Sequence, residues 1–438
     1  MSEPEPIQSV RGVHDILPDD QRKWQFIRRE LNTTARLFGF SRIDVPTIEY
    51  AELFDRSIGT ETDIVSKELF MVSQKEGQSG SLMALRPEFT AGIVRAYIQH
   101  GFRSKPQPVR LYTHGSLFRY DRPQKGRYRE HTQFGAEILG AKSAADDAWI
   151  IYLGWRFLQR LGLKDVQIQI NSLGSKLSQE QYVKKVQKYF TPFKEQLSKT
   201  DQRRLELNPL RLIDSKDEVI QKHLEDAPQA LDSLDKESKE FFSQLLGYLD
   251  EYNISYNLNP RIVRGLDYYT HTAFEITVEN ESGQQGSLGG GGRYDGLAEQ
   301  IGGVNVAGVG FGIGLDRVMS ELVKQHTKIP AMQHGCDLYL IHLSKRGRRK
   351  AQEILELLHG GGFVTLHSPD RPGLRSQLKQ ADKRQARYAI IIGETEAKSN
   401  ICILRDMKSG IQEDILYTDL VSTLTDRLRN GRSARLLH

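Results

Sequence analysis

Hydrophobic and polar positions alternate on both sides of a short basic segment that begins near residue 119. Before it, Leu117 and Arg119 fall on one side of an expected strand, and Phe118 and Tyr120 fall on the other. Beyond it, the apolar face of a second expected strand consists of Phe134, Ala136 and Ile138. The opposite face consists of Gln133, Gly135 and Glu137. With the Pro and Gly of segment 121–126 between the strands, the pattern predicts a β-hairpin.

The two unusual features of this hairpin are its glycine and its charge. Glycine weakens a strand, but at position 135 it clears space for something to lie against the backbone. Residues 119–129 contain four arginines and Lys125 against the single acid Asp121, a density that suits a polyanion. On spacing alone, a basic hairpin with a solvated polar face explains the pattern equally well.

Elsewhere in the first three quarters of the chain, periodicity predicts helices and strands in a mixed order. A helix is expected after Pro18, with Trp24, Ile27 and Leu31 on one face, and a strand at 40–47. Further strands are expected at 81–85, 166–170 and 306–311, and a helix at 88–100. From 177 to 253 Lys and Glu dominate, and apolar residues recur at helical spacing, which predicts a helical insertion.

Four consecutive glycines occur at 289–292. Neither a P-loop nor a Rossmann fingerprint surrounds them. We expect these glycines to let the backbone approach a flat ligand or a neighbouring strand.

The last quarter of the chain has a different organisation. The periodicity lapses at 324–333, where we expect a linker. Beyond it, strands expected at 337–343, 363–366, 388–392 and 401–405 alternate with helices at 351–358 and 374–383. This alternation predicts a separate α/β domain with a largely parallel sheet.

Composition excludes several classes of protein. The chain has 438 residues, of which 27% are charged, and no apolar run approaches the ~20 residues of a membrane span. Two cysteines without CxxC spacing argue against a disulfide scaffold or a zinc ribbon. The polar, acidic start lacks the features of a signal peptide, so we expect a cytoplasmic protein without membrane contact. The net charge of +5 permits a nucleic-acid partner but does not require one.

The hairpin sequence FRYDRPQKGR, with the Gln and Glu that follow, resembles motif 2 of the class II aminoacyl-tRNA synthetases in its histidyl-tRNA synthetase form. LRPEFTA at 85–91, RGLDYY at 264–269 and GFGIGLDR at 310–317 resemble further blocks of the same family, and the likeness covers nearly the whole chain. It implies an α+β catalytic domain with an antiparallel sheet at 1–325 and a helical insertion at 177–253. It also implies a C-terminal α/β anticodon-binding domain at 334–438.

The resemblance also implies an activity and its site. The family's members are ligases that activate histidine with ATP and Mg²⁺ and transfer it to histidine tRNA, as homodimers. The implied catalytic residues are Arg264 and Arg119. The implied histidine-binding residues are Glu88, Thr90, Arg119, Gln133, Glu137, Arg264, Tyr268 and Tyr269. The implied ATP-binding residues are Arg119, Arg127, His131 and Arg317. At the tip of the hairpin, the implied contacts to the tRNA acceptor end are Arg122, Gln124 and Lys125, and no side chain is expected to be a metal ligand.

Three residues depart from the family pattern. Phe89 stands where the family has a small residue, and His131-Thr132 stands where it has Phe-His. His131 falls on the same strand face as Gln133 and Glu137, so we expect its ring to stack on adenine and its titration to affect ATP binding between pH ~6 and ~8.

Two other functions remain to be considered. One is a regulatory, synthetase-like protein, such as the regulatory subunit of ATP phosphoribosyltransferase, which lacks the anticodon-like domain and departs at the RGLDYY block. The other is a class II synthetase for another amino acid, such as threonine or glycine. The RGLDYY block and the insertion segments within 208–216 disfavour it.

Overall fold

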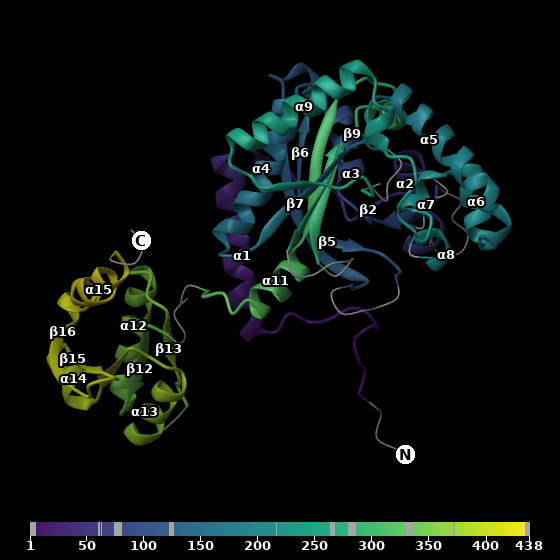
Figure 1. Cartoon of the computed structure of the whole chain (residues 1–438). Helices are drawn as coiled ribbons and strands as arrows, with labels where there is room; N and C mark the ends of the chain where they lie inside the picture. Colours follow the sequence, from purple (N-terminus) through teal and green to yellow (C-terminus); the bar gives the residue numbers. More distant parts are fainter. Residues whose placement is uncertain are drawn as a thin grey trace, which may run out of the picture. The chain divides into compact units, whose positions relative to one another are not determined.

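The computed structural model describes residues 6–59, 62, 64–73, 81–121, 127–215, 217–262, 268–278, 286–329, 336–370 and 373–433. The chain forms two compact units, Met1–Ile329 and Pro330–His438 (Figure 1). Within the described residues, no helix is both long enough and apolar enough to cross a lipid bilayer.

A mixed, mostly antiparallel sheet is the centre of the first unit. Its strand order among the described residues is β1-β5-β6-β11-β10-β9-β7-β8. The strands are β1 (Ser41–Arg42), β5 (Val109–Phe118), β6 (Glu130–Leu139), β11 (Gly308–Gly314), β10 (Ser287–Arg293), β9 (Thr270–Val278), β7 (Val166–Ser172) and β8 (Tyr256–Leu258). Only the two edge pairs, β1–β5 and β7–β8, are parallel. The predicted hairpin is β5–β6, and the antiparallel sheet is confirmed.

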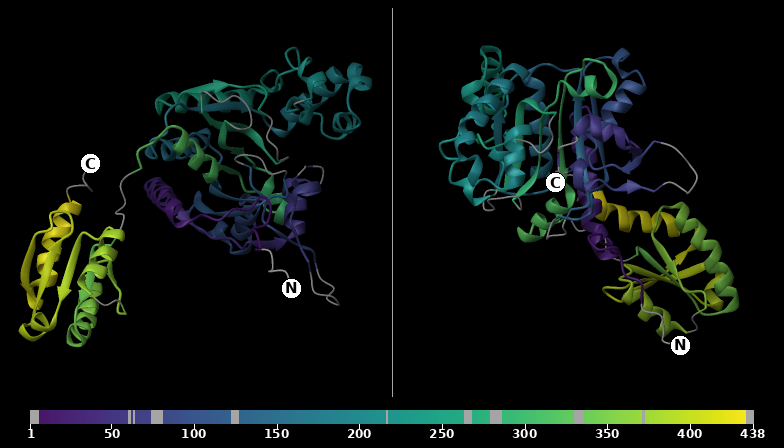
Figure 2. Two further views of the ribbon diagram at one scale, coloured as in Figure 1. Left: turned by 90° about the horizontal axis from the view of Figure 1, so that it is seen from below. Right: turned by 90° about the vertical axis from the view of Figure 1, so that its right-hand side faces the viewer.

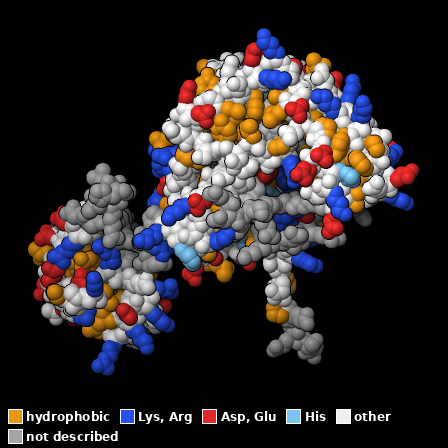
Figure 3. All heavy atoms as spheres, viewed as in Figure 1, with side chains coloured by type: hydrophobic (Ala, Val, Ile, Leu, Met, Phe, Trp, Pro, Cys, Tyr) orange, Lys and Arg blue, Asp and Glu red, His pale blue; other side chains and the backbone are white. Residues whose placement is uncertain are grey.

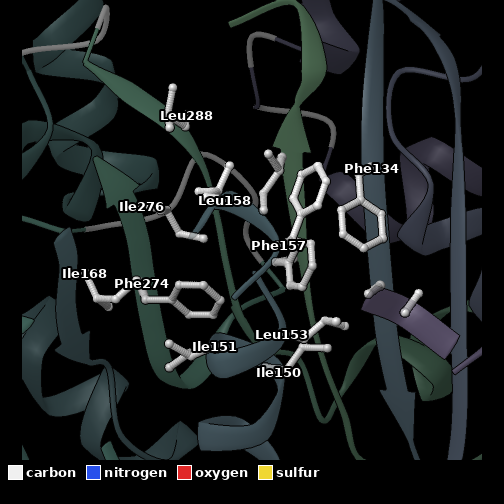
Figure 4. Packing of buried hydrophobic residues seen from close by; sticks show 14 of the residues in the cluster. Phe134, Ile150, Ile151, Leu153, Phe157, Leu158, Ile168, Phe274, Ile276 and Leu288 are labelled. Carbon is white, nitrogen blue, oxygen red and sulfur yellow. The ribbon is translucent and has the colours of Figure 1, made fainter. Parts of the chain in front are cut away.

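One face of this sheet carries the main hydrophobic core. Helices α1 (Pro18–Leu37), α4 (Ala144–Arg160), α9 (Lys236–Glu251) and α11 (Leu315–Lys324) contribute to it. The even-numbered residues of β6, Phe134, Ala136 and Ile138, point into this core as the alternation predicted. Figure 4 shows Phe134 and Phe157 edge to face, with ring centroids 5.2 Å apart.

The opposite face of the sheet is covered by α3 (Thr90–Gln99) and α10 (Leu297–Gly302), which share a smaller core with Leu117 and Leu139. Beside it lie α2 (Ala51–Ile58) and a small sheet of β2 (Ile48–Tyr50), β4 (Met83–Leu85) and β3 (Met71–Val72). The strand predicted at 40–47 is wrong in extent, because only Ser41–Arg42 pairs with β5. Pro46 lacks the N–H that a ladder needs.

The segment between β7 and β8 is helical, as predicted, but it divides between two cores. Helices α5 (Lys176–Phe190), α6 (Lys199–Leu207), α7 (Leu210–Ile213) and α8 (Glu218–Gln221) lie to one side of the sheet (Figures 1 and 2). Their apolar residues form a separate core around Tyr182 and Phe190. Helix α9 instead buries Phe242, Leu245 and Leu249 in the main core. Segment 177–253 is therefore helical throughout its main elements but is not one separate insertion, because α9 belongs to the main core.

The C-terminal unit contains a sheet of order β13-β12-β14-β15-β16 in its described residues. The strands are β13 (Thr365–His367), β12 (Leu338–His342), β14 (Tyr388–Ile392), β15 (Ile401–Asp406) and β16 (Gln412–Leu416). The helices are α12 (Lys345–Gly360), α13 (Leu374–Lys383), α14 (Glu394–Ser399) and α15 (Tyr417–Ser433). The α/β class is confirmed, but β15 and β16 pair antiparallel, so the sheet is only partly parallel.

The four glycines of β10 serve a neighbouring strand, which is one of the two predicted alternatives. Gly291 pairs with Phe311 of β11, and a Cβ on Gly291 would lie 2.7 Å from the Phe311 Cα and still closer to the Gly310 carbonyl. The obstacle is backbone, which cannot rotate away as a side chain can.

We therefore expect Gly291→Ala to lower the free energy of unfolding by about 1–3 kcal/mol, the usual cost of overpacking a core. Gly247→Ala is the control, because Gly247 lies within α9 with no atom near its missing Cβ. This second change should raise stability by about 0.5–1 kcal/mol. Urea denaturation of both variants measures the two effects, and equal stability of Gly291→Ala and the parent would contradict the packing argument.

Candidate active site

The floor of the candidate site is a strand that carries glycine at every second position. Strand β11 has the sequence Gly308-Val-Gly-Phe-Gly-Ile-Gly314, and its apolar residues Val309, Phe311 and Ile313 enter the main core. A Cβ on Gly308, Gly310 or Gly312 would collide with Tyr294, Glu137 or Gln133, respectively. The three polar side chains therefore lie directly on the bare face of β11.

Gly135 of the neighbouring strand β6 also leaves space above the backbone, and the side chain of Phe89 lies in that space. A Cβ on Gly135 would lie 3.4 Å from Cδ2 of Phe89. The Phe89 ring is 2% exposed, and the Arg86 guanidinium lies 4.8 Å from its centroid. The large residue that departs from the family pattern thus fills the space above Gly135, between Gln133 and Glu137.

Two buried carboxylates, Glu88 and Glu137, are linked by Thr90. The Thr90 hydroxyl donates to Glu137 Oε1 at 2.8 Å, and the Thr90 amide donates to Glu88 Oε2 at 2.5 Å. Glu88 Oε1 also accepts from the Ala91 amide at 2.8 Å, so this carboxylate caps the start of α3. Because helix N-termini favour anions, the position of Glu88 is fixed without a ligand.

Tyr294 completes this network from the far side. Its hydroxyl donates to Glu137 Oε2 at 2.5 Å. The Tyr268 hydroxyl lies near the Thr90 side chain. The Tyr268 ring stands edge-on to Tyr294, with ring centroids 5.7 Å apart, and lies beside Tyr269, with ring centroids 4.7 Å apart. The expected histidine-binding residues Glu88, Thr90, Glu137 and Tyr268 therefore lie in one connected group.

Burial dominates the electrostatics of this group. The pKa of Glu137 is raised from 4.5 to about 8: burial is the main cause, the hydrogen bonds from Tyr294 and Thr90 oppose it, and the nearby Glu88 carboxylate adds to it. Burial also raises the pKa of Glu88. Two carboxylates of this kind form a site that gains stability when a cation enters.

The other end of the site is positively charged. Arg119 donates from Nε to the Pro87 carbonyl at 2.9 Å, and Arg317 donates from Nη1 to the Ser287 carbonyl at 2.7 Å. Arg127 pairs with Asp121 at 3.0 Å. Burial, followed by mutual repulsion with other arginines, lowers the pKa of Arg317. The three predicted phosphate ligands in the described residues thus gather at one place.

His131 lies among these arginines. Burial, then repulsion by Arg119 and Arg317, lowers the pKa of His131 to about 3. The sequence-based expectation that this ring titrates between pH ~6 and ~8 is therefore wrong, because burial disfavours the charged ring and the two arginines repel a further positive charge. The ring is neutral throughout that range and presents an aromatic surface.

Two residues of the site were missed from the sequence. Tyr294 holds Glu137, and Asp316 Oδ2 accepts from the Thr132 amide at 2.6 Å, which ties the start of α11 to β6 next to Arg317. Neither had a signal of its own in the sequence. The alternating glycines of 308–314, however, indicate a strand with one bare face, and that pattern predicts a pocket floor.

Some predicted site residues lie outside the described residues: Arg264, Arg122, Gln124 and Lys125. In the described part of the chain, no cluster of three or more His, Cys, Asp or Glu side chains has the arrangement of a metal site.

Comparisons with known proteins agree with this geometry. The family model of histidyl-tRNA synthetase matches residues 12–318, and that of the anticodon binding domain matches 337–427. A histidine–tRNA ligase of Caldicellulosiruptor bescii is 39% identical over 423 residues, which cover 97% of this chain and 99% of that protein. A histidine–tRNA ligase of Synechococcus sp. is also 39% identical, and the match covers 97% of this chain and 100% of that protein.

Among solved structures, apo histidyl-tRNA synthetase of S. aureus superposes with a TM-score of 0.81 at 32% identity, covering 96% of this chain and 100% of that one. A protein of Bacillus halodurans described as an ATP phosphoribosyltransferase regulatory subunit/histidyl-tRNA synthetase shares the fold, with a TM-score of 0.63 at 22% identity and coverage of 89% and 99%. The extent of the family match and of the 39% identity decides between the alternatives. The chain belongs to the histidyl-tRNA synthetase family.

Proposed function

We propose that this chain is a histidine–tRNA ligase whose site separates a cation-binding end from an anion-binding end. The observation that carries the proposal is the pair of buried carboxylates, Glu88 and Glu137, close to Arg119, which follows β5, and to Arg317 of α11. Histidine offers an ammonium group and an imidazole to the first end. The carboxylate of histidine and the phosphates of ATP are directed to the second.

At the cation-binding end, Glu137 and the Tyr268–Tyr269 pair hold the imidazole. Glu88, Thr90 and Gln133 hold the amino-acid backbone. A polar pocket of this type rejects analogues strongly, because a ligand without the ring nitrogens offers no hydrogen-bonding or cationic partner to the buried Glu137 carboxyl group.

At the anion-binding end, the first reaction step joins the histidine carboxylate to the α-phosphorus of ATP and releases pyrophosphate. The protein needs no covalent nucleophile for this step; it holds the reactants in line and supplies positive charge. Arg119 and Arg264 serve the α-phosphate and carboxylate, and Arg127 and Arg317 serve the outer phosphates, because guanidinium groups bind phosphate oxygens in pairs.

Mg²⁺ carried in on ATP fits this end of the site. The Glu275 carboxylate lies close enough to Arg317 to raise its pKa, and carboxylate oxygens suit magnesium. The ion would neutralise phosphate charge that the arginines leave uncovered.

For the second step we propose contacts with histidine tRNA in three places. The tip residues Arg122, Gln124 and Lys125 contact the acceptor end, the insertion at 177–253 lies over the acceptor arm, and the domain at 334–438 binds the anticodon. In Figure 3, Lys and Arg side chains are visible on the C-terminal unit together with acidic ones, so the visible face is not uniformly basic. The catalytic domain at 1–325 forms a cytoplasmic homodimer in this proposal.

The deciding experiment is histidine-dependent exchange of pyrophosphate into ATP, with and without tRNA, followed by charging of histidine tRNA. We expect exchange without tRNA and charging with it. Absence of exchange from the folded protein would favour a regulatory protein. Exchange driven by threonine or glycine would assign another substrate.

Glu137→Gln keeps the size of the side chain but removes the carboxyl group that can ionise beside a bound imidazole. We expect the KM for histidine to rise about 10- to 100-fold, because a hydrogen bond to a charged group contributes about 1.5–3 kcal/mol. The KM for ATP should change little. Parallel exchange assays that vary one substrate at a time measure this difference, and equal rises in both constants would contradict the assignment of Glu137 to histidine.

The raised pKa of Glu137 makes the stability of the ligand-free protein depend on pH. Below about 4.5 the group is protonated in both the folded and the unfolded state, and its stabilising contribution is complete. Between about 5 and about 8 only the unfolded state releases the proton, so the wild type should lose up to about 1.4 kcal/mol per pH unit relative to Glu137→Gln. Urea denaturation of both proteins at pH 5.5, 6.5 and 7.5 tests this, and a wild type that gains stability relative to Glu137→Gln as the pH rises would contradict it.

His131 should stack on adenine as a neutral ring. His131→Ala should raise the KM for ATP about 10-fold, within the range for a base stacked on an aromatic side chain. His131→Phe should retain wild-type binding, and the ratio of its KM to that of the wild type should stay constant between pH 6 and 8, because the pKa of His131 is about 3. ATP titrations at saturating histidine decide the matter. An unchanged KM in His131→Ala would show that something else holds adenine.

A further inference from the structure

The root of the helical insertion contacts the segment that carries the two pocket tyrosines. Gln179 lies in the first turn of α5, directly after the chain leaves β7. Its Nε2 donates to the Tyr269 carbonyl at 3.0 Å and to the Gly174 carbonyl at 3.4 Å. One amide group thereby joins the first helix of the insertion to the start of β9.

Tyr269 has little freedom at this place. A Cβ on Gly292 would lie 2.8 Å from Cδ1 of Tyr269, so the ring lies flat on β10. The ring also packs against the small cluster of Leu173, Ile262 and Ala273 at the insertion root. The Tyr269 ring also lies beside the Tyr268 ring, with centroids 4.7 Å apart, and the Tyr268 hydroxyl lies near Thr90 in the proposed histidine pocket.

Hydrogen bonds also join the start of α5 to the start of α9. The Ser175 and Ser178 hydroxyls both donate to Asp235 Oδ2, and the Ser175 amide donates to the Ser238 hydroxyl at 2.9 Å. Hydrogen bonding, led by Ser175, lowers the pKa of Asp235 well below its usual value. The start of α5 is thus joined to the start of α9, which packs in the main core, and this contact fixes the position of Gln179 next to Tyr269.

We propose that Gln179 is a positioning residue for histidine recognition: its amide fixes the Tyr269 carbonyl and, through it, the Tyr268–Tyr269 rings. This inference rests on the proposed function, because it takes those tyrosines to line the histidine pocket. Gln179 does not touch the substrate. It gives the insertion a direct mechanical connection to amino-acid selection, separate from any contact of the insertion with tRNA.

The test separates the hydrogen bond from the bulk of the side chain. Gln179→Met and Gln179→Glu keep the length but remove both donors, and Gln179→Lys restores a donor that can reach the two carbonyls. We expect the KM for histidine in pyrophosphate exchange to rise about 3- to 10-fold in the first two, the range for loss of one neutral hydrogen bond. In Gln179→Lys it should stay within 2-fold of wild type, and the KM for ATP should stay unchanged in all three. Gln181→Ala is the control, because Gln181 is exposed two residues further along the same helix.

The outcomes distinguish the inference from the function on which it rests. If Glu137→Gln raises the KM for histidine but Gln179→Met and Gln179→Glu do not, Gln179 has no positioning role. If those two variants raise the KM values for both substrates and lower the melting temperature, Gln179 only supports the fold, and the inference is overturned. If Glu137→Gln itself has no effect, the proposed pocket is wrong and the inference falls with it.

Discussion

Strand β11 carries only glycines on one of its two faces, and the arrangement of the candidate site depends on this bare face. Tyr294, Glu137 and Gln133 each lie over one of its glycines, where a methyl group would displace them. A strand with glycine at every second position is intrinsically weak. It persists because Val309, Phe311 and Ile313 are buried on the other face and because β6 and β10 pair with it on both edges.

The second constraint is electrostatic. The buried carboxylates, Glu88 and Glu137, and the partly buried arginines would each be costly alone. Hydrogen bonds from Thr90, Tyr294 and the first turn of α3 hold the carboxylates, and backbone carbonyls hold the arginines. Both groups are thus positioned before any substrate arrives. A reaction between a cationic amino acid and a polyanionic nucleotide requires little rearrangement of such a site.

Where the sequence predicted the arrangement of the side chains correctly, a local rule was sufficient. Period-two alternation put Gln133 and Glu137 on one face, because side chains of a strand point alternately to opposite sides. Where it failed, the cause was distant in the chain. The titration expected for His131 is suppressed first by burial and then by repulsion from Arg119 and from Arg317, which lies 186 residues further along. Tyr294 reaches Glu137 across a sequence separation of 157.

By itself, the sequence determined the two sheet-containing units, the β5–β6 hairpin, the helical character of the insertion and the family, because each rests on local periodicity or on contiguous motifs. Only the tertiary structure decided that α9 belongs to the main core and that the C-terminal sheet is partly antiparallel. It alone put Phe89 in the space above Gly135, the Tyr294 hydroxyl on Glu137 and the Gln179 amide on the Tyr269 carbonyl. These features depend on contacts between strands and helices from different parts of the chain. A local pattern of residues does not specify such contacts.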